Sequence, residues 1–196
     1  MEWSILFAGP VGAGKTEAIR TISDIEVVGT EEGATDDVAF LKDNTTEAMD
    51  MGVMYLEGGD KVRLYGAPGQ KRFDFMWDIL LEQACALVVL VDHSRPHPVD
   101  DMRFYLSEML DRMGGRLIPV VVGVTHVDFA DRCDLNVYRE ALQSVPGVLG
   151  GAASPVLAID ARRRRDVRAL LMALTSMLDI SERFPWRVES GRKFNA

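Results

Sequence analysis

Residues 9–16, with the sequence GPVGAGKT, constrain the fold of this chain more than any other segment. They match the pattern G-x-x-x-x-G-K-[ST], follow an apolar run at 3–8 typical of a buried strand, and precede a helical pattern at 17–22. In this context glycines let backbone N–H groups converge on phosphate oxygens at the start of a helix. We therefore predict a phosphate-binding P-loop, in which Lys15 reaches the β- and γ-phosphates of a nucleotide and the Thr16 hydroxyl binds Mg²⁺.

Apolar runs of strand length alternate with helical patterns along the chain. We predict strands at 3–8, 52–57, 61–65, 86–92, 117–124 and 155–159, and helices at 14–23, 70–83, 99–112, 134–144 and 163–179. The runs at 86–92 and 117–124 are almost entirely apolar, as in strands covered on both faces. This order predicts a doubly wound, three-layer α/β domain. Residues 26–50 and the tail from Ser181 show no clear period.

The bulk composition narrows the possible partners. A chain of 196 residues fits one domain, and its net charge of −8 argues against general affinity for nucleic acid or anionic lipid. Cys85 and Cys133 lack metal-ligand spacing, and the histidines His93 and His97 indicate a polar loop rather than a metal site. No apolar run is long enough for stable membrane insertion and no signal peptide is recognisable, so we expect a cytoplasmic protein with free thiols.

A second motif follows the strand predicted at 61–65. Residues 66–70 read GAPGQ, and the backbone N–H of Gly69 can contact a γ-phosphate. The Gln70 side chain can orient an attacking water, although it can equally be the first residue of the helix predicted at 70–83. The segment is therefore a candidate sensor of the γ-phosphate, with Gln70 and Lys15 as the candidate catalytic residues.

A third motif lies at the end of the strand predicted at 117–124. It consists of Thr125, His126, Val127 and Asp128. A carboxylate there can accept hydrogen bonds from N1 and N2 of guanine, a donor pair that adenine lacks. Asp128 alone would be an ordinary carboxylate at a strand end, but in this combination guanine recognition is favoured. Residues 160–162, at the end of the last predicted strand, form a loop that can close over the base.

With these motifs in this order and spacing, residues 3–180 resemble a small Ras-like GTPase of the bacterial MglA and conservon (CvnD-type) group. The resemblance implies a Ras-like G domain at 1–180 with a tail at 181–196. It implies a P-loop NTPase fold with a mostly parallel six-stranded sheet and one antiparallel edge strand. It also implies a roadblock-type regulatory partner, an unknown effector, and a switch threonine that binds Mg²⁺ and the γ-phosphate. Thr46 is the match for that threonine, with Thr45 as the near alternative.

The predicted site then has two metal ligands, Thr16 and Thr46, and a larger set of residues that bind GTP or GDP. That set is Gly9, Val11, Gly12, Ala13, Gly14, Lys15, Thr16, Glu17, Thr46, Gly69, Thr125, His126, Asp128, Asp160, Ala161 and Arg162.

Several positions depart from the family pattern. Gly66 stands where the family usually has an aspartate that holds Mg²⁺ through water, so weaker Mg²⁺ binding is expected. Val11 replaces a glycine and would crowd an arginine finger, and Thr45 stands where MglA has its own arginine. The base motif has Thr125 and His126 in place of asparagine and lysine. These departures predict a guanine-nucleotide switch with slow GTP hydrolysis.

The same departures support an alternative, a hydrolysis-deficient pseudo-GTPase that binds GTP or GDP and acts as a scaffold. An ATP-dependent kinase-type enzyme is a weaker possibility, because Asp128 argues against it and no arginine-rich lid is evident.

Overall fold

The computed structural model describes residues 2–29, 49–56, 58–69, 74–130, 132–145 and 154–183. Its strands are β1 (Glu2–Ala8), β2 (Val28–Gly29), β3 (Asp50–Tyr55), β4 (Lys61–Gly66), β5 (Ala86–Asp92), β6 (Val120–Thr125) and β7 (Val156–Ala158). Its helices are α1 (Lys15–Ile22), α3 (Phe75–Gln83), α4 (Pro98–Arg112), α5 (Leu135–Gln143) and α6 (Arg164–Arg183), with a single 3₁₀ turn, η2, at Val127–Phe129. Each strand and helix predicted from the sequence has a counterpart in this set.

The strands form one sheet in the order β2-β3-β4-β1-β5-β6-β7. The five strands from β4 to β7 in that order run parallel to one another, whereas β3 pairs antiparallel with β4. The predicted three-layer P-loop fold, with a mostly parallel sheet and an antiparallel strand near one edge, is confirmed. The structure adds β2, a two-residue strand that pairs antiparallel with β3 and was not predicted.

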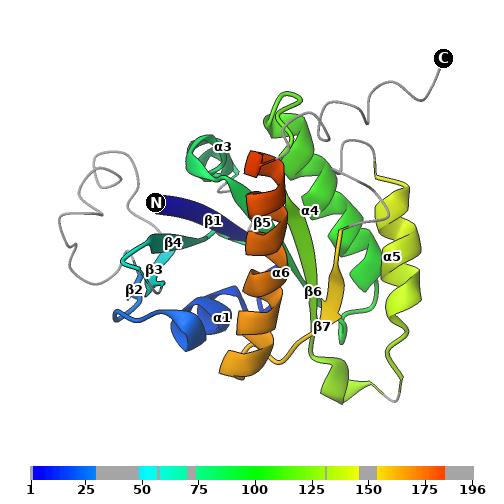
Figure 1. Cartoon of the computed structure of the whole chain (residues 1–196). Helices are drawn as coiled ribbons and strands as arrows, with labels where there is room; N and C mark the ends of the chain where they lie inside the picture. Colours follow the sequence, from blue (N-terminus) through cyan, green and yellow to red (C-terminus); the bar gives the residue numbers. More distant parts are fainter. Residues whose placement is uncertain are drawn as a thin grey trace.

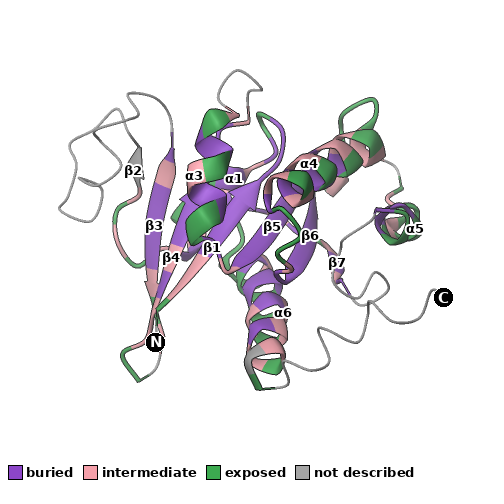
Figure 2. Ribbon diagram, turned by 90° about the horizontal axis from the view of Figure 1, so that it is seen from above, coloured by how far each residue is buried: buried purple, intermediate pink, exposed green. Residues whose placement is uncertain are grey.

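Two apolar cores separate the sheet from the helices on its two faces (Figures 1 and 2). Along β1, Leu6 belongs to the core under α3, α4 and α5, whereas Ile5 and Phe7 belong to the core under α1 and α6. The central strands β5 and β6 are buried at almost every position, which explains their continuous apolar runs. On α6, an apolar stripe from Val167 to Leu178 is buried in the core that also contains residues of the sheet.

The topology places the important motifs at one edge of the sheet. Strands β1, β4, β5, β6 and β7 are parallel, so their carboxyl ends share that edge, and each is followed by a loop carrying one of the predicted motifs or a polar turn. Ligands of open α/β sheets bind outside these carboxyl ends. Helix α6 continues to Arg183, beyond the predicted end at 179. Among the described helices, none is long and apolar enough to cross a membrane.

Candidate nucleotide-binding site

The P-loop has the backbone that its glycines predict. Gly9, Gly12 and Gly14 have φ values of 139°, 84° and 89°, a region that other residues rarely adopt. A Cβ on Gly9 would lie 2.1 Å from the carbonyl oxygen of Leu90, so only glycine fits between β1 and β5 there. Gly14 is the N-cap of α1, so the first backbone N–H groups of that helix follow directly on the loop and have no partner within the helix.

Lys15 is buried within the loop that it follows, with only 8% of its surface exposed. Its Nζ donates hydrogen bonds of 2.8 Å to the carbonyl oxygens of Gly9 and Pro10. Burial lowers the pKa of Lys15 to about 8, and the nearby Asp50 carboxylate opposes that shift. Keeping a buried ammonium charged costs free energy when no anion is nearby, and a bound phosphate would offset that cost.

The Thr16 hydroxyl, the predicted metal ligand, donates a 2.5 Å hydrogen bond to Oδ2 of Asp50. Asp50 opens β3 and pairs in register with Gly66 of β4. We did not predict a role for Asp50, because its approach to Thr16 depends on how β3 pairs with β4. Thr46, the second predicted metal ligand, and Thr45 lie outside the described residues.

Gly69 lies directly against the P-loop. A Cβ at this position would lie 2.6 Å from the backbone nitrogen of Val11 and 2.9 Å from Lys15 Nζ. The helices on one face of the sheet hold this segment in place. The Tyr105 hydroxyl of α4 donates to the Gly69 carbonyl at 2.7 Å, and Trp77 Nε1 of α3 donates to the Pro68 carbonyl at 3.0 Å. Gln70, the predicted catalytic residue, lies just beyond the described part of this segment.

The motif after β6 sits beside the P-loop. The Thr125 hydroxyl lies 3.1 Å from the carbonyl oxygens of both Ala13 and Val91, and it therefore links β6 to the P-loop and β5. His126 adopts a left-handed conformation with φ 56°, and its Nδ1 lies 3.3 Å from Oδ1 of Asp92. The Thr125 hydroxyl thus connects three segments of the candidate site.

The loops after β6 and β7 enclose a cavity of about 350 Å³ beside the P-loop. It is lined by Gly12, Gly14, Glu17, Thr125, His126, Asp128, Phe129, Asp160, Ala161 and Arg162. All of these except Phe129 are residues predicted to bind nucleotide. Phe129, with 73% of its surface exposed, carried no motif that would have indicated it. A larger cavity of about 710 Å³, lined by residues of β3 and α6, contains none of the predicted site residues, so volume alone does not identify the site.

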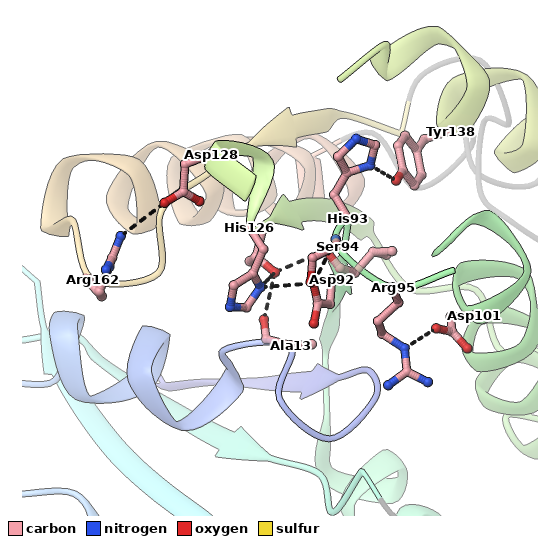
Figure 3. Close-up of polar contacts among 12 residues, drawn as sticks. Ala13, Asp92, His93, Ser94, Arg95, Asp101, His126, Asp128, Tyr138 and Arg162 are labelled. Atoms are coloured by element: carbon pink, nitrogen blue, oxygen red, sulfur yellow. Dashed lines mark hydrogen bonds and ion pairs between the residues drawn. The ribbon is translucent and has the colours of Figure 1, made fainter. Parts of the chain in front are cut away.

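Arg162 connects the two carboxylates of this cavity. Asp160 accepts hydrogen bonds from the backbone N–H of Arg162 at 3.0 Å and from its guanidinium at 2.9 Å. These bonds lower the pKa of Asp160 to about 2. Asp128 lies 3.7 Å from Arg162 Nη2, and 60% of its side chain is exposed. Figure 3 shows the two side chains turned toward one another. The Asp128 carboxylate therefore has acceptor capacity left for a ligand.

Other polar residues near these strand ends satisfy one another. Nδ1 of His93 lies 2.6 Å from the Tyr138 hydroxyl, and Nε of Arg95 lies 2.6 Å from Asp101. Within the described ranges, no group of three or more His, Cys, Asp or Glu side chains is arranged to hold a metal ion. Among the described residues, neither Cys85 nor Cys133 forms a disulfide, and Sγ of Cys85 lies 3.2 Å from the Ser4 carbonyl oxygen.

Comparison with known proteins assigns the chain to a family. A family model described as "Conserved hypothetical ATP binding protein" matches residues 24–184, more than half of the chain. An uncharacterized protein of Methanocaldococcus jannaschii is 26% identical over 138 residues, which cover 70% of this chain and 79% of that protein.

These findings correct the predicted resemblance to the MglA and conservon group, which was wrong: the matching family is a different one. Many nucleotide-binding α/β domains share a P-loop, a glycine predicted to contact the γ-phosphate and a loop predicted to close over the base. The motifs therefore indicated a nucleotide ligand correctly, whereas the assignment to the MglA and conservon group was wrong. The predicted roadblock-type regulator rested on that resemblance and stays untested.

Proposed function

The chain belongs to the family of conserved hypothetical ATP-binding proteins, and from that premise we propose that it is a Mg²⁺-dependent nucleotide switch that selects guanine and hydrolyses GTP slowly. The single observation that carries the guanine assignment is the position of Asp128 in the cavity beside the P-loop. The family description names ATP, so ATP is the competing ligand.

The cavity supports guanine because of its acceptor chemistry. An ionised carboxylate only accepts hydrogen bonds, and guanine presents two adjacent donors, N1–H and N2–H, on one edge. Adenine has an acceptor at N1, so at that position the base and the Asp128 carboxylate would both present acceptors. Arg162 can hold the carboxylate in place from one side while the base binds at the other. Phe129 and Ala161 supply apolar surface for the ring.

The phosphate end supports a slow hydrolase. Lys15 would neutralise charge on the β- and γ-phosphates, and Gly69, which packs against Val11 and Lys15 of the P-loop, would sense the γ-phosphate through its backbone N–H. Thr16 would hold Mg²⁺, which spreads the negative charge that develops during phosphoryl transfer. Gln70 would orient the attacking water. Val11, with 57% of its surface exposed at the mouth of the loop, would obstruct a stabilising arginine from a partner, and this supports a low rate.

Titration calorimetry of the purified protein with Mg²⁺ and GTP, GDP or ATP tests the choice of base. We expect GTP and GDP to bind roughly 10- to 100-fold more tightly than ATP, the range expected of one good bidentate base contact. Equal or tighter binding of ATP would establish the ATP-binding function that the family description names.

Asp128→Asn sharpens this test. An amide both donates and accepts, so it matches xanthine, which has a carbonyl where guanine has its 2-amino group. We expect the variant to lose affinity for GTP and gain affinity for xanthosine triphosphate. Asp179→Asn, a charge-matched change at the exposed end of α6, should alter neither. Loss of GTP binding with no gain for xanthosine triphosphate would mean that Asp128 only shapes the loop.

A binding module without hydrolysis is the second candidate, and the absence of a carboxylate on Gly66 favours it. Single-turnover hydrolysis of GTP by the wild type and by Gln70→Ala separates the two. A measurable rate that falls in the variant supports the switch. A rate that Gln70→Ala leaves unchanged supports the scaffold.

A further inference from the structure

Asp50 occupies the place from which a carboxylate can serve the metal-binding threonine. It is the first residue of β3 and lies directly across from Gly66 of β4 in the antiparallel ladder. Its Oδ2 accepts the Thr16 hydroxyl hydrogen bond at 2.5 Å, although 34 residues separate the two in sequence. Its charge also acts on Lys15, the phosphate-binding cation. The carboxylate therefore interacts with the side chains of Lys15 and Thr16, the last two residues of the P-loop.

Gly66 and Asp50 fit one another sterically. A Cβ on Gly66 would lie 3.0 Å from Oδ2 and 3.1 Å from Cβ of Asp50, and 3.1 Å from Cδ1 of Ile19. Contacts this short mean that Asp50 or Ile19 would have to shift by a few tenths of an ångström to admit a side chain at 66. The glycine is thus what leaves room for a carboxylate that arrives from the neighbouring strand.

The donor set fits Mg²⁺. This ion takes oxygen ligands and is usually bound through one or two carboxylates together with substrate phosphates and water. When the Thr16 hydroxyl donates its hydrogen bond to Asp50, the lone pairs of Oγ1 stay free to face a cation. Hydrogen-bonded partners of this kind orient metal ligands and raise their basicity. The carboxylate adds a negative charge that favours the bound cation.

We propose that Asp50 is the metal-positioning carboxylate of this site: it orients the Thr16 hydroxyl toward Mg²⁺ and supplies the negative charge that Gly66 cannot. The proposal rests on the proposed function only in requiring that the protein bind a nucleotide together with Mg²⁺. It assigns the function of the missing aspartate to the strand opposite, so the absence of a carboxylate at position 66 does not by itself make the site deficient in metal.

Asp50→Asn tests the proposal, because asparagine keeps an oxygen that can accept the Thr16 hydrogen bond and removes only the charge. The readout is the ratio of nucleotide affinity with Mg²⁺ to that with EDTA, measured by calorimetry for whichever of GTP and ATP binds. We expect this ratio to fall by roughly tenfold or more, as for the loss of other outer-shell partners, with Mg²⁺-free affinity retained. Asp179→Asn should leave the ratio unchanged.

A double variant moves the carboxylate rather than removing it. Asp50→Gly combined with Gly66→Asp frees the space that Asp50 occupied and places a carboxylate on β4, so the ratio should recover toward that of the wild type. Either of two results for Asp50→Asn overturns the proposal: an unchanged ratio, or an equal loss of affinity with and without Mg²⁺. Failure of the wild type to bind any nucleotide overturns the proposed function as well, whereas an unchanged ratio in a protein that binds nucleotide overturns this inference alone.

Discussion

Burial of the charged Lys15 side chain costs free energy, and the same side chain is the proposed phosphate-binding group. Its ammonium lies among the Gly9 and Pro10 carbonyls with 8% of the residue exposed, and its pKa is lowered to about 8. A bound phosphate favours the charged form and raises that pKa. The protein should therefore take up protons when it binds nucleotide at pH 8 to 9, and its affinity should fall as the pH rises above about 8.

Calorimetry at pH 8.5 in two buffers of different ionisation enthalpy measures this proton uptake. We expect a fraction of a proton taken up per nucleotide bound. Lys15→Arg keeps a charge that does not titrate in this range, so any binding that it retains should show no such uptake. Binding by the wild type without proton exchange would contradict a lowered pKa for Lys15.

The chemistry at single residues was predictable where it depends on local sequence. Lys15 and Thr16 are fixed by the loop and helix around them, and Asp128 follows a strand at a spacing that brings it to the cavity beside the P-loop. Asp50 was not predictable in the same way. Its contact with Thr16 arises from the register between β3 and β4, which no local pattern specifies. Phe129 was missed for a similar reason, because only the fold brings it beside the closing loop.

At the scale of elements, the turn from β1 into α1 depends on one glycine more than on the others. Gly9 combines a φ of 139° with a Cβ position only 2.1 Å from the Leu90 carbonyl oxygen, whereas Gly12 has a φ of 84° and nothing within 4 Å. Gly9→Ala must therefore push β1 away from β5, and Gly12→Ala meets only backbone strain. We expect Gly12→Ala to lower the free energy of unfolding by about 1 kcal/mol and Gly9→Ala by more than ~3 kcal/mol.

Urea unfolding followed by tryptophan fluorescence, to which the buried Trp77 contributes, compares the two variants. Similar losses of stability would mean that the Gly9 contact relaxes without cost.

Element types and order were predictable because the apolar periods are strong. The runs that became β5 and β6 are buried on both faces, and α6 has a clear apolar stripe. The ends of the elements were less predictable. The strand predicted at 117–124 begins only at Val120, and α6 extends to Arg183. The two residues of β2 are too few to carry a period, and they become a strand only through pairing with β3. The predicted division at 180/181 stays a prediction.

At the scale of the whole molecule, the described residues of the proposed site lie at one edge of the sheet. The P-loop, Gly69, the loop after β6 and the loop after β7 all follow carboxyl ends of parallel strands. The turn at 58–60 between β3 and β4 and the segment at 114–118 before β6 lie at the other ends of their strands. Binding should therefore order one edge of a molecule whose two cores are already packed.

Hydrogen exchange with and without saturating Mg²⁺ and nucleotide tests this polarity. A ligand present at 100 times its Kd stabilises the native state by about 2.7 kcal/mol, which slows exchange that requires global unfolding everywhere. Amides that exchange by local opening respond only where the ligand touches them. We expect added protection at 9–16, 125–129 and 159–162, and unchanged exchange at 58–60 and 114–118. Equal protection of both edges would place the ligand elsewhere, whereas protection confined to 9–16 would mean that phosphate alone is bound and that Asp128 has no role in recognising the base.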